Sequence, residues 1–146
     1  MTQDNRADVK QLRQSATAIH QIVEEQMAAG IDSRRIVVGG FSQGGAVALE
    51  AGLSCPHPLA GIMSLSSYFP TAETVAISPA NRHLPIRIFH GTADPVVDES
   101  LGRQSVQALL SKGYEPEYST YPMQHSVCPA EIRDISEWLQ TVLTGN

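Results

Sequence analysis

One stretch of this sequence decides the fold: Ile36-Val37-Val38-Gly39-Gly40-Phe41-Ser42-Gln43-Gly44-Gly45-Ala46-Val47-Ala48-Leu49. Its first part is short, apolar and β-branched, which is typical of a buried strand. Its last part is rich in small apolar residues, which suits a helix packed closely against a sheet. Between the two parts, Ser42 has a glycine two positions away on either side. The sequence therefore predicts a strand that turns directly into a helix, with a serine at the turn.

Such a serine has a strained backbone and an exposed hydroxyl, the arrangement known as a nucleophile elbow. Side chains at positions 40 and 44 are expected to collide with the neighbouring strand or helix, which explains the glycines there. We therefore predict that Ser42 is a nucleophile. The alternative is a glycine-rich turn with an incidental serine, because the G-x-S-x-G pattern also arises by chance. The strand before the serine and the helix after it favour the first interpretation.

The composition limits the class of protein. The chain has 146 residues, 42% of them hydrophobic and 17% charged, which is ordinary for a globular protein, and we expect one domain over residues 1–146. Its 15 acidic and 10 basic residues give a formal charge of −5, and no basic cluster occurs. Nucleic acid and anionic membrane surfaces are therefore not expected as partners. No apolar run approaches transmembrane length, so we expect no integral membrane segment.

The two cysteines, Cys55 and Cys128, lie far apart and lack C-x-x-C spacing. This spacing argues against a disulfide framework and against a zinc site. We expect a protein of the reducing cytoplasm that holds no metal and needs no cofactor.

Apolar periodicity and turn residues predict an alternation of helices and strands. Helices are expected over residues 7–29, 44–52, 98–113 and 132–143, and strands over 36–39, 59–65, 84–90 and 114–121. The segment 71–82 is expected to be a loop. Strands that alternate with helices imply a parallel sheet with right-handed crossovers. Functional residues are then expected beyond the carboxyl ends of the strands.

A nucleophilic serine needs a carboxylate and a histidine, which should follow it in that order, each just past a later strand. Asp94 follows the third strand, and it is preferred to Asp98, which resembles the N-cap of the next helix. His125 follows the fourth strand, and it is preferred to His90, which stands at the last position of the third strand. A loop aspartate and a surface histidine are the alternative for each residue alone. Three residues in this order at three strand ends are much harder to produce by chance.

Three segments closely resemble the carboxylesterase and acyl-protein thioesterase (lysophospholipase-like) family of α/β-hydrolases: Gly39-Gly40-Phe41-Ser42-Gln43-Gly44-Gly45-Ala46, His90-Gly91-Thr92-Ala93-Asp94-Pro95-Val96-Val97 and Tyr121-Pro122-Met123-Gln124-His125-Ser126-Val127. Residues 132–139 also resemble the closing helix of that family. The resemblance implies that Ser42 is the nucleophile, His125 the general base and acid, and Asp94 the residue that orients His125. It also implies that the backbone N–H of Gln43 binds the oxyanion. Gln124 departs from the pattern, because the family more often has a small residue before the histidine.

A larger departure is what the sequence lacks relative to the family. Members have several strands before the first helix seen here, and a His-Gly loop among them supplies a second oxyanion N–H. The resemblance therefore implies an α/β-hydrolase-like fold with an N-terminally shortened parallel sheet of about four strands flanked by helices. Loss of one oxyanion donor costs roughly 10²–10³ in rate. The strand over 36–39 is then expected to be an exposed edge, so we expect a homo-oligomer formed through the uncovered side of the sheet.

The expected chemistry is acyl transfer in two steps, with a small-molecule ester or acyl thioester as substrate and with short to medium acyl chains. Tyr68 and Phe69 after the second strand, and Val96 and Val97 after Asp94, are candidates for the substrate pocket, although ordinary loop packing explains them equally well. The alternative function is a catalytically weak or silent hydrolase-like scaffold that acts through self-association. The three retained site residues favour the enzyme, and the missing oxyanion loop favours the scaffold.

Overall fold

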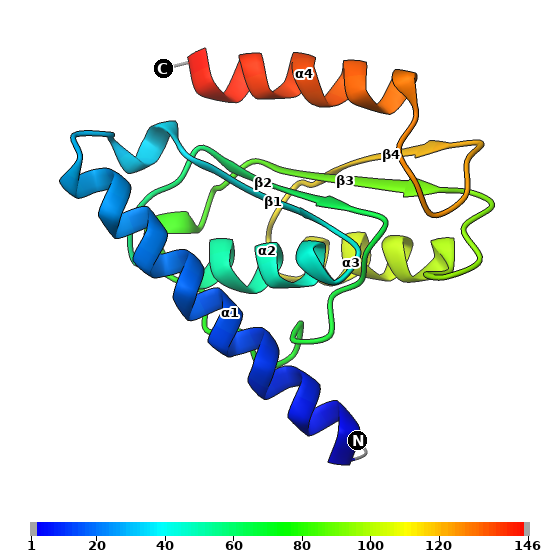
Figure 1. Cartoon of the computed structure of the whole chain (residues 1–146), viewed down its shortest axis with the longest axis horizontal. Helices are drawn as coiled ribbons and strands as arrows, with labels where there is room; N and C mark the ends of the chain where they lie inside the picture. The colour runs from blue at the N-terminus through cyan, green and yellow to red at the C-terminus, as the bar shows by residue number, and fades with distance from the viewer. Residues whose placement is uncertain (1–2, 145–146) are drawn as a thin grey trace.

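The computed structural model describes the backbone of residues 3–144 and the side chains of residues 8–144. Residues 1–2 and 145–146 of the predicted domain lie outside this part. The described chain alternates between helices and strands, as the sequence predicts (Figure 1). The elements are α1 (Gln3–Ala28), β1 (Val37–Phe41), α2 (Gln43–Ser54), β2 (Gly61–Leu65), β3 (Ile86–Gly91), α3 (Glu99–Ser111), β4 (Glu117–Tyr121) and α4 (Pro129–Thr144), with short 3₁₀ turns η1 (Ser33–Arg35) and η2 (Pro79–Asn81).

The four strands form one parallel sheet in the order β1-β2-β3-β4. This confirms the predicted shortened α/β-hydrolase-like sheet. The strand over residues 114–121 begins later than predicted, at Glu117. The reason is that Tyr114 closes the turn that follows α3: its amide donates to the Leu109 carbonyl, and its hydroxyl donates to the Asn81 carbonyl.

The two faces of the sheet are covered unequally. Helices α1, α2 and α3 lie on one face and α4 alone lies on the other (Figure 1). Even-numbered strand residues point toward the three helices and form the larger core with them, and odd-numbered residues point toward α4. The larger core includes Val38, Leu49, Leu53, Ile62, Ile86, Ile88 and Leu109. The smaller core, under α4, is built on Leu65, Phe89, Tyr121 and Met123.

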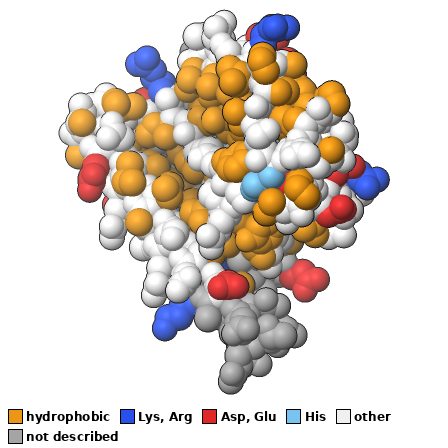
Figure 2. Space-filling model, turned by 45° about the vertical axis from the view of Figure 1, so that its right-hand side comes forward, with side chains coloured by type: hydrophobic (Ala, Val, Ile, Leu, Met, Phe, Trp, Pro, Cys, Tyr) orange, Lys and Arg blue, Asp and Glu red, His pale blue; other side chains and the backbone are white. Residues whose placement is uncertain are grey.

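Strand β1 is an edge of the sheet in the described part of the chain, because it pairs with β2 alone. Phe41, the last residue of β1, is 40% exposed at this edge. Figure 2 turns the carboxyl ends of the strands toward the viewer and shows hydrophobic side chains gathered around a histidine. The expected exposed apolar edge is therefore present.

The helix boundaries follow from local sequence. Gly30 has a φ of +101°, and the amide of Ile31 donates to the Gln26 carbonyl, so the glycine ends α1 in a left-handed turn. Asp98 is the N-cap of α3, as predicted, and its carboxylate accepts from the Ser100 amide. None of the described helices combines the length and the apolar character that crossing a bilayer requires.

Candidate active site

Ser42 lies at the turn between β1 and α2, with φ +58° and ψ −124°. This left-handed backbone is strained for a residue with a side chain. The strain is held by the sheet, because the Ser42 amide donates to the Leu65 carbonyl at 2.8 Å. A glycine is needed at position 40, because a Cβ there would lie 2.1 Å from the Gly44 carbonyl oxygen in the first turn of α2. The predicted strand–serine–helix turn is therefore present.

The prediction for Gly44 is wrong. A Cβ at Gly44 would have no described atom within 4 Å, so packing does not require glycine there. The crowded position is Gly45, where a Cβ would lie 2.6 Å from both the Ser64 Oγ and the Ser67 Cβ. The close contact of α2 with the sheet is therefore made one residue later than the motif suggests, against the end of β2.

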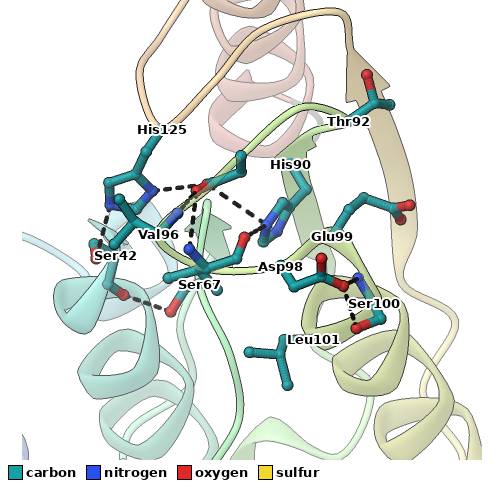
Figure 3. Close-up of polar contacts among 12 residues, drawn as sticks. Ser42, Ser67, His90, Thr92, Val96, Asp98, Glu99, Ser100, Leu101 and His125 are labelled. Atoms are coloured by element: carbon teal, nitrogen blue, oxygen red, sulfur yellow. Dashed lines mark hydrogen bonds and ion pairs between the residues drawn. The ribbon is translucent and has the colours of Figure 1, made fainter.

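The structure brings Ser42, His125 and Asp94 together at the carboxyl ends of β1, β4 and β3. Figure 3 shows the His125 ring directed at Ser42. The distance from Ser42 Oγ to His125 Nε2 is 3.1 Å, and that from His125 Nδ1 to Asp94 Oδ2 is 2.7 Å. An ionised carboxylate can only accept, so Nδ1 carries the proton that it donates to Asp94. Nε2 is then left as the acceptor for the Ser42 hydroxyl.

The side chain of Asp94 is fully buried, and each of its carboxylate oxygens has a partner. Oδ1 accepts from the amides of Val96 at 2.8 Å and Val97 at 2.9 Å, and Oδ2 accepts from His125. Burial by itself would raise the pKa of Asp94. The hydrogen bonds from the Val97 amide, His125 and the Val96 amide outweigh burial and hold this pKa below its usual value. Asp94 is therefore kept ionised beside the imidazole.

The two rejected candidates of the sequence analysis support the Asp94 loop. His90 is fully buried, and its Nε2 donates to the Val97 carbonyl at 2.7 Å and lies 3.7 Å from Asp94 Oδ2. Asp98 caps α3, and hydrogen bonds from the Ser100 hydroxyl and amide lower its pKa. Neither side chain is hydrogen-bonded to His125.

Gln43 is the first residue of α2, where backbone amides have no partner within the helix. Two neighbours of Ser42 were missed by the sequence analysis. The Phe41 ring lies against the His125 ring, with centroids 4.7 Å apart. The Ser67 hydroxyl donates to the Ser42 carbonyl (Figure 3). The only signal for Ser67 in the sequence is its position just past the end of a predicted strand.

The four residues predicted for a substrate pocket occupy different environments. Tyr68 and Phe69 line an open cavity of about 310 Å³ against Leu101 and Ala108 of α3. The side chain of Val96 is 68% exposed, whereas that of Val97 is buried. The structure thus gives Val96 and Val97 a contact that the sequence analysis did not anticipate, since both backbone amides bind Asp94.

Within the described residues, no group of three or more histidine, cysteine, aspartate or glutamate side chains is placed to hold a metal ion. The chemistry that this geometry can perform is transfer of the Ser42 proton to His125 during attack of the serine oxygen on an electrophile. Asp94 is placed to stabilise the imidazolium that results.

Comparison with known proteins gives consistent matches. A sequence profile of the phospholipase/carboxylesterase family matches residues 1–143. The chain is 39% identical over 141 residues to acyl-protein thioesterase 1 of Gibberella zeae, which covers 93% of this chain and 60% of that protein. It is 42% identical over 130 residues to acyl-protein thioesterase 1 of Neurospora crassa, which covers 86% of this chain and 53% of that protein. The chain thus spans little more than half the length of these relatives.

Solved structures match in the same way. SOBER1 of Arabidopsis thaliana superimposes with a TM-score of 0.83 at 27% identity, over 90% of this chain and 64% of that one. Zea mays acyl-protein thioesterase 2 superimposes with a TM-score of 0.76 at 26% identity, over 88% of this chain and 64% of that one. The similarity therefore extends over most of this chain and over about two thirds of each structure.

Proposed function

The chain belongs to the phospholipase/carboxylesterase family, and from this we propose that it is a serine hydrolase that cleaves carboxylic esters and acyl thioesters. The observation that carries the proposal is the hydrogen-bonded series from Ser42 through His125 to Asp94, with distances of 3.1 and 2.7 Å. A serine hydroxyl, an imidazole in the correct tautomer and an ionised carboxylate are the three groups that acyl transfer needs.

In the proposed mechanism, His125 Nε2 takes the proton of Ser42 as the serine oxygen attacks the carbonyl carbon of the substrate. The tetrahedral intermediate collapses, and the imidazolium gives its proton to the alcohol or thiol that leaves. Water then attacks the acyl-enzyme with His125 again as the base, which releases the carboxylic acid and restores Ser42. Asp94 keeps Nδ1 protonated and stabilises the imidazolium at each step.

The backbone N–H of Gln43 is the donor that we assign to the oxyanion, because it adjoins Ser42 at the first position of α2. A site with one such donor is expected to be slower by roughly 10²–10³ than a site with two. Weak turnover is therefore part of the proposal.

We assign short to medium acyl chains to the side of the site formed by Tyr68, Phe69, Val96 and Val97. The apolar cavity lined by Tyr68 and Phe69 supports this assignment. Tyr68 directly follows Ser67, which donates to the Ser42 carbonyl. Of the four side chains, Val96 is the most accessible to a ligand, at 68% exposure.

The test is covalent labelling with a fluorophosphonate probe, together with hydrolysis of p-nitrophenyl butyrate. We expect the wild-type protein to react with the probe and to hydrolyse the ester, and Ser42→Ala to do neither. Ser126→Ala is the matched control, because Ser126 is an exposed serine next to His125. Equal hydrolysis by wild type and Ser42→Ala would rule out the enzyme and leave the silent scaffold as the function.

We also propose that the protein associates with itself through the β1 side of the sheet. The support is the unpaired edge of β1 in the described chain, which ends at the exposed Phe41. Sedimentation velocity at micromolar concentration should detect an oligomer that Phe41→Glu weakens, because Phe41 is an exposed residue of β1. A monodisperse wild-type monomer would contradict this proposal.

A reducing cytoplasm remains the proposed location. It is supported by Cys55 and Cys128, which are both free thiols in the structure.

A further inference from the structure

Two residues other than glycine have a positive φ in the described chain, and both are serines at strand ends. Ser42 follows β1 with a φ of 58°, and Ser66 follows the neighbouring strand β2 with a φ of 52°. The Ser66 amide is held by the Phe89 carbonyl of β3, so the sheet fixes this second strained turn as it fixes the first. The turn at Ser66 delivers the next residue, Ser67, to the base of the nucleophile elbow.

The Ser67 side chain is enclosed at that place. Ser67 is 3% exposed, and its hydroxyl donates to the Ser42 carbonyl at 2.5 Å, with the Tyr68 carbonyl farther away at 3.4 Å. The Gly45 amide donates to the same Ser42 carbonyl at 2.9 Å. A Cβ at Gly45 would lie 2.7 Å from the Ser67 Oγ. The absence of a side chain at Gly45 thus leaves room for the Ser67 hydroxyl to reach the Ser42 carbonyl.

The Ser42 carbonyl and the Gln43 N–H belong to one peptide unit. The unit is planar and trans, so the two groups point in opposite directions, and fixing one of them fixes the other. A hydrogen bond to the carbonyl also polarises the unit and makes its N–H a stronger donor. We infer that Ser67 is a positioning residue that orients and polarises the Gln43 N–H for the oxyanion by holding the Ser42 carbonyl. This inference rests on the proposed function, which gives the Gln43 amide its role.

The test compares Ser67→Ala with Ser64→Ala. Ser64 is equally buried, at 3% exposure, and it also faces Gly45, yet it makes no hydrogen bond to the Ser42 carbonyl. We expect Ser67→Ala to lower kcat for p-nitrophenyl butyrate about tenfold with little change in KM, because the donor remains but is less well aimed. Ser64→Ala should keep kcat within about twofold of the wild type. Equal losses in the two variants would assign Ser67 to packing alone and overturn the inference.

Ser67→Cys gives a second kinetic comparison, and it replaces Ser67→Ala if that variant does not fold. A thiol is a weaker donor than a hydroxyl, so kcat should lie between those of the wild type and Ser67→Ala. A Ser67→Cys variant as slow as Ser67→Ala, with intact secondary structure, would count against the hydrogen bond.

The amide nitrogen shift of Gln43, measured by NMR, separates this inference from the proposed function. That shift responds to hydrogen bonding at the Ser42 carbonyl whether or not the protein turns over a substrate. It should move in Ser67→Ala and not in Ser64→Ala. An unchanged Gln43 shift in Ser67→Ala would overturn the inference even in an active enzyme. An inactive wild type would instead overturn the proposed function, and the shift would still decide whether Ser67 controls this peptide unit.

Discussion

Asp94 and Glu131 are two buried carboxylic acids, one before and one after His125 in the sequence. They differ in the hydrogen-bond donors around them. Asp94 follows β3, and its oxygens accept from two amides and from His125. Glu131 lies in the first turn of α4 and is fully buried. Neither of its oxygens has a hydrogen-bond partner among the described residues.

The pKa values of the two carboxyl groups differ for this reason. Hydrogen bonds outweigh burial at Asp94 and hold its pKa below the usual value. At Glu131 burial acts without such partners and raises the pKa to about 7. One carboxyl is therefore kept ionised, whereas the other takes up a proton near neutral pH.

The comparison teaches that hydrogen-bond donors, and not burial, decide whether a buried carboxyl group stays ionised. At Asp94, backbone donors from the loop after β3 are aimed at the oxygen that does not bind His125. Glu131 is buried to the same degree or more, yet neither of its oxygens has a donor among the described residues. The predictions below alter one of these two environments at a time.

The largest effect is expected from Asp94→Asn. The amide group of asparagine can donate to His125, which favours the tautomer with the proton on Nε2 and removes the acceptor for the Ser42 hydroxyl. By analogy with the serine protease triad, kcat for p-nitrophenyl butyrate should fall roughly 10³–10⁴-fold. Steady-state hydrolysis at pH 7.5 measures this effect.

Asp98→Asn is the matched control, because Asp98 lies four residues away and caps α3 without touching His125. Its activity should stay within about twofold of the wild type, because asparagine is also a good N-cap. A loss of activity in Asp98→Asn as large as that in Asp94→Asn would reverse our assignment of the acid.

The next effect concerns the stability of Glu131→Gln. Because the folded pKa of Glu131 lies above its usual value, folding favours the protonated form, and the stability of the wild type falls as the pH rises through 7. Glutamine does not titrate. The free energy of unfolding of Glu131→Gln, relative to that of the wild type, should therefore rise by about 2 kcal/mol between pH 5 and pH 8.

Urea unfolding at the two pH values measures this difference. Glu137→Gln serves as the control, since Glu137 lies on the same helix and is exposed. A Glu131→Gln variant whose stability relative to the wild type is the same at both pH values would show that Glu131 is ionised in the folded protein and has donors.

The sequence was enough to place Ser42, Asp94 and His125 near one another. Parallel strands end at one edge of the sheet, so residues that directly follow β1, β3 and β4 must lie along that edge. Apolar and β-branched runs were also enough to identify the four strands of the described chain, although β4 is buried at Tyr121 alone.

The sequence could not reveal contacts that depend on the depth of packing between elements. The motif suggested that Gly44 is crowded, yet α2 approaches the sheet most closely at Gly45. Glu131 directly precedes the helix predicted over residues 132–143, whereas α4 begins at Pro129, and no pattern in the sequence indicates that Glu131 is buried. Ser67 is one of two adjacent serines, and only the positive φ of Ser66 directs it to Ser42.

A smaller effect is expected at His90, which supports the Asp94 loop through the Val97 carbonyl. His90→Met removes this donor and should lower kcat about tenfold, because the loop that aims its amides at Asp94 loses an anchor. His90→Gln keeps an N–H at a similar reach and should recover part of the loss. Circular dichroism checks that both variants fold, and equal kcat values for folded Met and Gln variants would exclude the hydrogen bond as the cause.

The smallest effect separates the two contacts assigned to Val96. Its amide binds Asp94, whereas its exposed side chain is proposed to meet the acyl chain. Val96→Ala keeps the amide and removes apolar surface, so we expect KM for p-nitrophenyl butyrate to rise about two- to threefold with kcat unchanged. The acetate ester is the internal control, since its shorter chain should lose less. If kcat falls and KM does not rise, the side chain of Val96 stabilises the Asp94 loop and does not contact the acyl chain, and Val96 is then no part of the substrate pocket.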